Sequence, residues 1–329
     1  MHCCPYCGCH AADSADHIFP RFLGGRRTVK ACRSCNSVFG HTFEAKVARE
    51  LEPLYVQLAK WGVPLSERQQ WWRSAFKVEG ALLDLGVGPN GVKARANQPI
   101  IERDANGEIA AAYFTNEDDL GRFWKMRPPD EQWVETQKTI STNLSNLRFS
   151  LNFGLAIKQL ALKMSLAVST RLPNFDAAER VRACEVLQSF SGDVHPLVSH
   201  YISSTDAAST GRPPLAHTVY VEHDGKCVKG IVEFFGAFRS FVELATTTGA
   251  LGRDAVFAYL DPVEVREHSG PIATLCLIPP PPAYPLQEMA EHQVGMIQTF
   301  VAGAIARGAK GRPEIRLNLR FDNVRTSRE

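Results

Sequence analysis

The sequence lacks a long apolar run. No stretch of its 329 residues approaches the roughly 18 to 20 apolar residues that a membrane-spanning helix needs. The first ten residues, MHCCPYCGCH, also lack the apolar core of a secretory signal peptide. We therefore expect a cytoplasmic protein with no membrane association.

The chain also lacks an excess of charge of one sign. Lys and Arg total 37 against 35 Asp and Glu, so the formal net charge is only +2. Overall charge therefore cannot draw the protein to nucleic acid, and any such affinity must come from a local basic patch. Hydrophobic residues make up 44% of the chain, which excludes a largely disordered protein.

Several common catalytic signatures are missing as well. There is no internal repeat, and the C-terminal region has neither a phosphate-binding loop nor a Ser-His-Asp or Cys-His pattern. His217 and His223, in that region, are expected at the surface. The residues with a recognisable chemistry lie near the N-terminus.

Composition and periodicity divide the chain into three regions and predict an α+β protein. Residues 1–50 are rich in Cys, Gly, His and Arg and are too polar to form a core without help. Residues 51–205 are expected to be mainly helical, and residues 206–329 to be α+β with a regulatory, dimerisation or target-selection role.

The helical expectation for the middle region depends on apolar spacing. Residues 43–63 and 152–173 repeat apolar side chains every three or four positions, and Ser66 with Gln69 has the pattern of a capping box. Residues 80–114 are rich in turn signals and predict loops with short strands.

Period-two alternation predicts strands in the C-terminal region. A hairpin turns at His223-Asp224-Gly225, strands are expected at 255–265 and 272–278, and a last helix ends at Gly308. The tryptophans of the middle region are expected in the core rather than stacked on bases: Trp71, Trp72, Trp124 and Trp133.

Six of the nine cysteines fall within the first 35 residues. They include two CxxC pairs, Cys4 with Cys7 and Cys32 with Cys35, separated by 24 residues. Two such pairs supply the four thiolates of a tetrahedral zinc ion, so we predict a structural zinc site. Without the ion, a segment this polar is not expected to hold its shape.

Other interpretations of these cysteines stay open. They are free or redox-active thiols in one alternative. In another, a neighbouring residue replaces one ligand of the first pair; the candidates are His2, Cys3, Cys9 and His10.

The segment ADHIFPRFLGG, residues 15–25, lies between the two pairs. A strand ending in Asp16-His17, a Gly24-Gly25 turn, a return strand TVKA and a helix opening at CRSCNSVFG predict a ββα finger. Adjacent strand residues point to opposite faces, so Asp16 can face a metal while His17 faces a substrate. The alternative is an ordinary turn or helix-cap dipeptide.

The motifs DHIFPRFLGG and ACRSCNSVFGHTFE, flanked by CxxC pairs, resemble the HNH or ββα-metal endonucleases, in the branch whose helix reads Cys-x-x-Cys-Asn. The resemblance covers about residues 3–47. An HNH module ahead of a larger domain is similar to effectors of bacterial anti-phage systems.

This resemblance implies roles for individual residues. Asp16 would be a ligand of a divalent ion and His17 the general base. Asn36 would be the second ligand of that ion, with His41 as a competing candidate. The family usually has an asparagine about where Arg27 stands here, which leaves the support of His17 open.

The residue types suit phosphodiester hydrolysis. A histidine with an ordinary pKa of about 6.5 can take a proton from water near neutral pH. A carboxylate and an amide oxygen suit Mg²⁺ or Mn²⁺ as the catalytic ion, whereas zinc suits the four thiolates.

A cluster of cations surrounds this motif, with no acidic residue between positions 17 and 43. Its members are Arg21, Arg26, Arg27, Lys30 and Arg33. We expect them to contact phosphates, which positions a nucleic acid without reading its sequence. A solvated charged face is the alternative.

The sequence therefore predicts a metal-dependent HNH endonuclease that cuts DNA, with double-stranded DNA as the expected partner. One alternative is a non-catalytic zinc-ribbon protein that binds nucleic acid. Another is a nuclease effector, as a monomer or homodimer, that a ligand or partner protein bound to the C-terminal region switches on.

Overall fold

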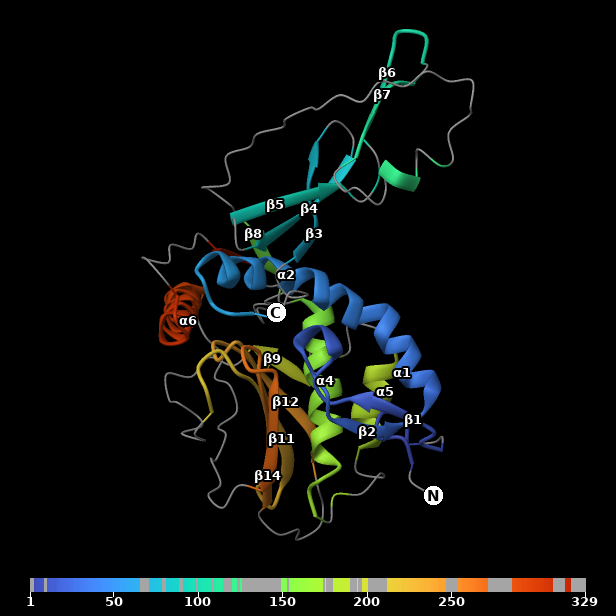
Figure 1. The fold of residues 1–329 in the computed structure, drawn as a ribbon. Coiled ribbons are helices and arrows are strands. Elements are labelled where there is room, and N and C mark those ends of the chain that lie inside the picture. The colour runs from blue at the N-terminus through green and yellow to red at the C-terminus, as the bar shows by residue number, and fades with distance from the viewer. Residues whose placement is uncertain are drawn as a thin grey trace.

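The computed structural model shows a protein of mixed helices and strands (Figure 1). The residues that it describes are 3–8, 11–65, 71–78, 81–88, 91–96, 98, 100–107, 109–114, 120–122, 125, 149–152, 154–173, 175, 180–189, 194, 197–200, 212–246, 254–271, 286–309 and 317–320. No helix among them is long and apolar enough to cross a membrane. The strand expected at 272–278 lies outside these residues, as do Trp124 and Trp133.

The N-terminal segment begins with a short hairpin. Strand β1 (Ser14–His17) pairs antiparallel with β2 (Thr28–Ala31), and the 3₁₀ turn η1 (Arg21–Leu23) lies between them. Gly24 ends this turn with φ of 101°, a left-handed conformation that favours glycine. The turn predicted at Gly24-Gly25 is confirmed.

One long helical segment follows the hairpin. It runs through α1 (Arg33–Phe39), a π-helical turn η2 (Gly40–Glu44) and α2 (Ala45–Lys60), with Pro53 inside α2. The expected domain boundary at residue 50 therefore falls inside a helix. A π turn adds a residue to the helical turn and changes which side chains face a neighbouring element.

A six-stranded antiparallel sheet forms the largest layer. Its order is β14-β13-β10-β11-β12-β9, and the predicted hairpin turns between β10 (His217–His223) and β11 (Cys227–Phe234). The remaining strands are β9 (Val198–His200), β12 (Phe238–Thr246), β13 (Asp254–Asp261) and β14 (Arg266–Pro271). The strand that alternation predicts near residue 255 is therefore confirmed as β13.

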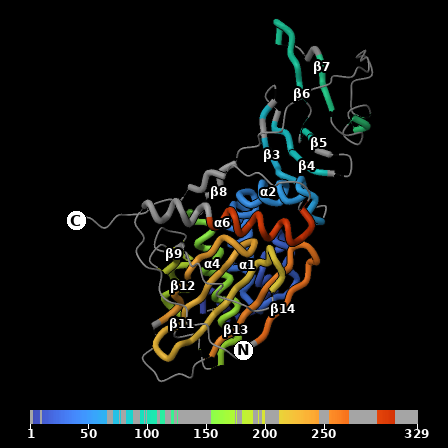
Figure 2. The backbone as a smooth tube through the Cα atoms, turned by 90° about the vertical axis from the view of Figure 1, so that its left-hand side faces the viewer, coloured from blue at the N-terminus to red at the C-terminus, as the bar shows by residue number. Residues whose placement is uncertain are grey.

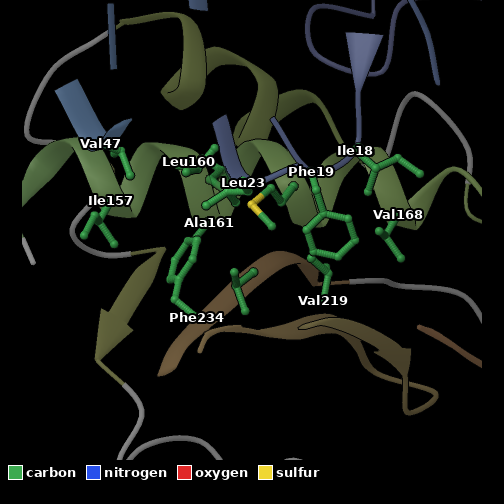
Figure 3. Close-up of a cluster of buried hydrophobic side chains, with 14 of the residues drawn as sticks. Ile18, Phe19, Leu23, Val47, Ile157, Leu160, Ala161, Val168, Val219 and Phe234 are labelled. Carbon is green, nitrogen blue, oxygen red and sulfur yellow. The ribbon is translucent and has the colours of Figure 1, made fainter. Parts of the chain in front are cut away.

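Helix α4 (Leu155–Ser169) lies between this sheet and the N-terminal segment. Figure 3 shows Ile18, Phe19 and Leu23 of the N-terminal segment in one cluster with α4 residues and with Val219 and Phe234 of the sheet. Nearly every side chain of α4 is buried, which is typical of a helix covered on all sides. The N-terminal segment and the sheet therefore share one core.

The expectation of a mainly helical middle region is wrong for residues 71–78, whereas the short strands expected at 80–114 are present. Strands β3 (Trp71–Val78), β4 (Ala81–Gly88) and β5 (Gly91–Ala96) form one sheet, and β6 (Ile100–Arg103) pairs with β7 (Ile109–Tyr113). Figures 1 and 2 both show these strands beyond α2, away from the six-stranded sheet.

The reason lies in strand pairing. The capping-box pattern at Ser66 is a local signal, whereas Trp71, Trp72 and Phe76 of β3 lie opposite the apolar strand β4. Aromatic side chains favour this pleated, half-buried surface, and the cross-strand contacts override the local helical signal. Trp72 packs against the main core, as the sequence predicts.

The other elements complete the chain. Strand β8 (Phe149–Asn152) pairs in parallel with β15 (Leu317–Arg320). Helix α5 (Val181–Ser189) packs on α4, and α6 (Leu286–Ala306) is followed by Gly308 with φ of 94°. Thus the predicted C-terminal helix and its glycine stop are confirmed.

Candidate functional site

The four paired cysteines meet at one point. The Sγ atoms of Cys4, Cys7, Cys32 and Cys35 all lie within 4.8 Å of one another, and all four side chains are buried. Cys7 Sγ and Cys32 Sγ are 3.9 Å apart. That separation matches the edge of about 3.8 Å of a tetrahedron with metal–sulfur bonds of about 2.3 Å.

Local backbone geometry holds each pair in a tight turn. Gly8 N donates to Cys4 O at 2.9 Å with Gly8 at φ of 67°, and Cys35 N donates to Cys32 Sγ at 3.4 Å. Cys3 is exposed and outside the group, whereas His2, Cys9 and His10 lie outside the described residues. The structure therefore brings together the four cysteines that the spacing predicts.

The thiols also influence one another's ionisation. A hydrogen bond from Cys35 lowers the pKa of Cys4 to about 5, whereas Cys4 raises the pKa of Cys35 far above its ordinary range. Ionisation of one thiol therefore disfavours ionisation of its neighbour when no metal ion is bound. A divalent cation removes that conflict, so the cluster has the ligand number, type and spacing of a structural zinc site.

Asp16 and His17 occupy opposite faces of β1. Asp16 is 3% exposed and points toward α4. His17 is half-buried and reaches the outer side of the N-terminal module, which consists of the hairpin and the helical segment that follows it. The predicted divergence of the two side chains is therefore present. What each side chain meets is different from what the sequence suggests.

The buried partner of Asp16 is Lys163 of α4. Lys163 Nζ lies 3.0 Å from Asp16 Oδ1 and 2.8 Å from Asp16 Oδ2. The same ammonium contacts Glu44 Oε1 at the end of the π turn, and lies 3.5 Å from the carbonyl oxygen of His17. The ring centroid of Tyr6 is 5.7 Å away. A fully buried lysine needs such partners, because an unpaired charge is costly to bury.

Burial disfavours the charged forms of Glu44 and Tyr6, which both lie beside Lys163. Burial raises the pKa of Glu44, and the neighbouring Lys163 ammonium opposes that rise. Burial, with the nearby Asp16 carboxylate, also raises the pKa of Tyr6 well above its ordinary value. The surroundings of this cluster therefore disfavour further negative charge.

His17 is in a neutral state suited to accepting a proton. Arg21 Nε donates to His17 Nε2 at 3.3 Å, so Nε2 carries the lone pair and the ring proton lies on Nδ1. Partial burial, then the positive charge of Arg21, lowers the pKa of His17 below 6.5. The ring is therefore uncharged at neutral pH.

The other predicted site residues lie on the helical side of the module. Asn36 Nδ2 donates to Ser14 Oγ at 2.9 Å and to Ala15 O at 3.1 Å, which ties α1 to β1. His41 is exposed in the π turn. In this arrangement Asn36 uses its amide nitrogen to hold the strand that carries Asp16 and His17.

The predicted basic patch is exposed, and the fold adds an acidic residue to it. All five side chains are exposed: Arg21, Arg26, Arg27, Lys30 and Arg33. Glu267 of β14 accepts hydrogen bonds from the backbone nitrogens of Arg26 and Arg27, the second at 2.8 Å, and Arg27 Nη1 contacts Ser269 Oγ. Hydrogen bonds therefore join the loop after Gly24 and Gly25 to the sheet.

The oxygen donors that the resemblance assigns to a divalent ion do not converge. Both carboxylate oxygens of Asp16 lie against Lys163, and Asn36 turns its amide nitrogen to β1. In the described part of the chain, the cysteines are the only group of three or more Cys, His, Asp and Glu side chains close enough to share an ion. The arrangement does not fit a divalent ion at Asp16 while Lys163 is in place.

Sequence reasoning missed three residues at this site. Lys163 and Glu44 belong to helices whose local pattern gives no sign of Asp16, and Glu267 lies 240 residues or more from the loop that it holds. Lys163 within the apolar run of α4, which also holds Lys158, is a local signal. A charge at that position requires a buried partner.

Comparisons with known proteins agree with the motifs. Residues 4–52 match the family described as HNH endonuclease. Comparison with curated proteins and with solved structures found no match. Residues 4–52 are thus similar to the HNH endonuclease family, and four clustered cysteines lie beside the Asp-His strand of this segment.

Proposed function

We propose that the HNH segment hydrolyses phosphodiester bonds in DNA, with His17 as the general base. The observation that carries the proposal is the state of His17 within a segment of this family. His17 is half-buried at the edge of the module, is held neutral, and lies beside an exposed row of arginines. A neutral imidazole next to phosphate-binding cations is what hydrolysis of a nucleic acid requires.

In the proposed step, His17 takes a proton from a water molecule, and the resulting hydroxide forms the new bond to phosphorus. The bond from phosphorus to the 3′ oxygen breaks, and that oxygen gains a proton from solvent. Arg21 covers Nε2 of His17 in the DNA-free protein. A phosphate group would draw the guanidinium of Arg21 away, so substrate binding would free the base.

The finer parts of the proposal come from the resemblance and the charge pattern. Double-stranded DNA is the proposed substrate, and Mg²⁺ or Mn²⁺ the proposed ion, with Asp16 and either Asn36 or His41 as ligands. We also propose a role in anti-phage defence. Residues 51–205 and 206–329 would control when or where the module cuts, through dimerisation, target selection or an activating ligand.

A second function has its own support. Lys163 fills the space next to Asp16, and Arg21 covers His17. Both contacts would be expected in a zinc-ribbon protein that binds nucleic acid through its arginines and does not cut it. DNA cleavage distinguishes the two functions. Only a nuclease cleaves DNA, and it should lose that activity when His17 is replaced.

Cleavage of plasmid DNA tests the proposal. At low salt and with millimolar Mg²⁺ or Mn²⁺, the wild type should nick or linearise plasmid, and His17→Ala should be slower by about 100-fold or more. His268→Ala is the matched control, because His268 is an exposed histidine outside the module. It should cleave at the wild-type rate.

Two further measurements make the result decisive. Zinc content and melting temperature of His17→Ala should equal those of the wild type, since His17 lies outside the cysteine cluster. If the wild type binds DNA but cleaves it no faster than His17→Ala, the non-catalytic binding function replaces the nuclease proposal.

A further inference from the structure

Lys163 is bound the way a metal ion would be. Its Nζ atom lies 2.8 and 3.0 Å from the two oxygens of Asp16 and also contacts a carboxylate oxygen of Glu44. The side chain of Lys163 is 1% exposed and that of Asp16 4%. Two carboxylates from separate elements, β1 and the π turn, therefore converge on one buried cation.

The charges of this cluster do not balance. Asp16 and Glu44 contribute two negative charges when ionised, and Lys163 contributes one positive charge. A divalent cation in the same place would neutralise both carboxylates. Oxygen ligands of this kind are those that Mg²⁺ and Mn²⁺ prefer.

We propose that Lys163 is an internal counter-ion that fills the cation position of Asp16, and that a divalent ion binds there only when the Lys163 ammonium withdraws. Glu44, not previously assigned to the site, then becomes the second carboxylate ligand. The inference rests on the proposed function in one respect, since it regulates the same HNH centre. Its test depends on ion binding alone.

Helix α4 connects the Lys163 position, where the ammonium would give way to a divalent ion, to the rest of the protein. Helix α4 brings Lys163 to Asp16 of β1 and also packs on the six-stranded sheet. A ligand or partner that displaced α4 from the sheet side would therefore also displace Lys163 relative to Asp16.

Manganese binding to the zinc-loaded full chain tests the proposal. Lys163→Met removes the ammonium but keeps an unbranched apolar side chain, so it should bind Mn²⁺ at least about tenfold more tightly than the wild type. Lys158→Met is the matched control, because Lys158 is another buried lysine of the same helix α4. Electron paramagnetic resonance of free Mn²⁺ gives each affinity.

Two double variants locate the gain. Adding Asp16→Asn or Glu44→Gln to Lys163→Met should remove most of the added affinity, because each substitution deletes one carboxylate of the pair. Equal Mn²⁺ affinity in the wild type and Lys163→Met overturns the proposal. A gain that survives Asp16→Asn overturns it as well.

A measurement on the wild type decides the matter if Lys163→Met does not fold. Crystals soaked with Mn²⁺ should show, by anomalous scattering, either no ion at Asp16 or an ion with Lys163 withdrawn. An ion on Asp16 with Lys163 Nζ still at hydrogen-bond distance contradicts the proposal. None of these readouts uses DNA, so a failed cleavage assay would end the nuclease proposal and leave this one standing.

Discussion

At the scale of the residue, His217 is a buried histidine whose protonation links the stability of the protein to pH. It is fully buried at the start of β10, although the hairpin pattern places it at the surface. Phe235 N donates to His217 Nδ1 at 3.4 Å, so Nε2 carries the proton and donates to Tyr55 Oη at 3.0 Å. Burial lowers the pKa of His217 to about 3. His223, at the other end of the strand, is buried as well.

Acid should therefore destabilise the protein through His217. In the unfolded chain its pKa is about 6.5, so between pH 6.5 and about 3 only the unfolded state takes up this proton. The free energy of unfolding should fall by about 1.4 kcal/mol per pH unit through that window. Urea unfolding of the wild type and His217→Gln at several pH values measures the difference.

The control for this prediction is His268→Ala, since His268 is exposed. Its pH dependence should match the wild type, whereas His217→Gln should lose the steep part. Parallel curves for all three proteins between pH 6.5 and 4.5 would show that His217 is not the group responsible.

At the scale of elements, Gly25 and Gly40 differ in whether the structure has room for a side chain, although they lie only 15 positions apart. A Cβ on Gly25 would lie 1.6 Å from the carbonyl oxygen of Phe19, so the loop and the end of the strand segment pack without a gap. Gly40 has helical dihedrals, and a Cβ there would meet nothing within 4 Å. Close packing requires glycine at position 25, whereas the helical backbone at Gly40 has room for a larger residue.

Alanine substitutions should separate these roles. Gly25→Ala should destabilise the protein by about 2 kcal/mol or more, because backbone atoms cannot yield to the new methyl group. Gly40→Ala should be neutral or stabilise by about 0.5–1 kcal/mol, because alanine loses less conformational entropy in a helix. Denaturant unfolding measures both values.

Zinc release gives a second readout. Gly25→Ala should lose zinc to a chelator faster than the wild type, since the loop joins the two strands between the cysteine pairs. Gly40→Ala should not. Wild-type stability and zinc retention in Gly25→Ala would contradict the close packing at Phe19.

At the scale of the whole molecule, distant segments hold the HNH centre from two sides. Helix α4 supplies Lys163 from within, and β14 supplies Glu267 from the sheet. Burial raises the pKa of Glu267, and the backbone nitrogens of Arg26 and Arg27 oppose that rise. The arginine loop therefore depends on the sheet for its conformation.

Removing this contact should loosen the loop while the core stays intact. Glu267→Ala deletes the acceptor of both backbone hydrogen bonds, so amide exchange at Arg26 and Arg27 should be about tenfold faster, equivalent to about 1.4 kcal/mol of local stability. Hydrogen exchange followed by mass spectrometry measures it. Glu264→Ala, which removes an exposed acid in the turn between β13 and β14, is the control. Unchanged exchange in Glu267→Ala would mean that the contact does not order the loop.

Local patterns in the sequence determined the cysteine cluster, the Asp-His strand and the helix after it. CxxC spacing places two sulfurs at one turn, and a strand places adjacent side chains on opposite faces, so these features need little information from distant residues. The hairpin at Asp224-Gly225 and the last helix were predictable for the same reason. Strand β3 at 71–78 was not, because its pairing with β4 outweighs a local helical signal.

Only the tertiary structure decided what Asp16 faces. Lys163 lies 147 positions from Asp16 and Glu44 lies 119 from Lys163, so no sequence window contains the cluster. The burial of α4 between the module and the sheet forces its lysine to find carboxylate partners, because an unpaired ammonium cannot remain in the core. The sequence determined which residues can do chemistry, and packing determined which of them are already paired.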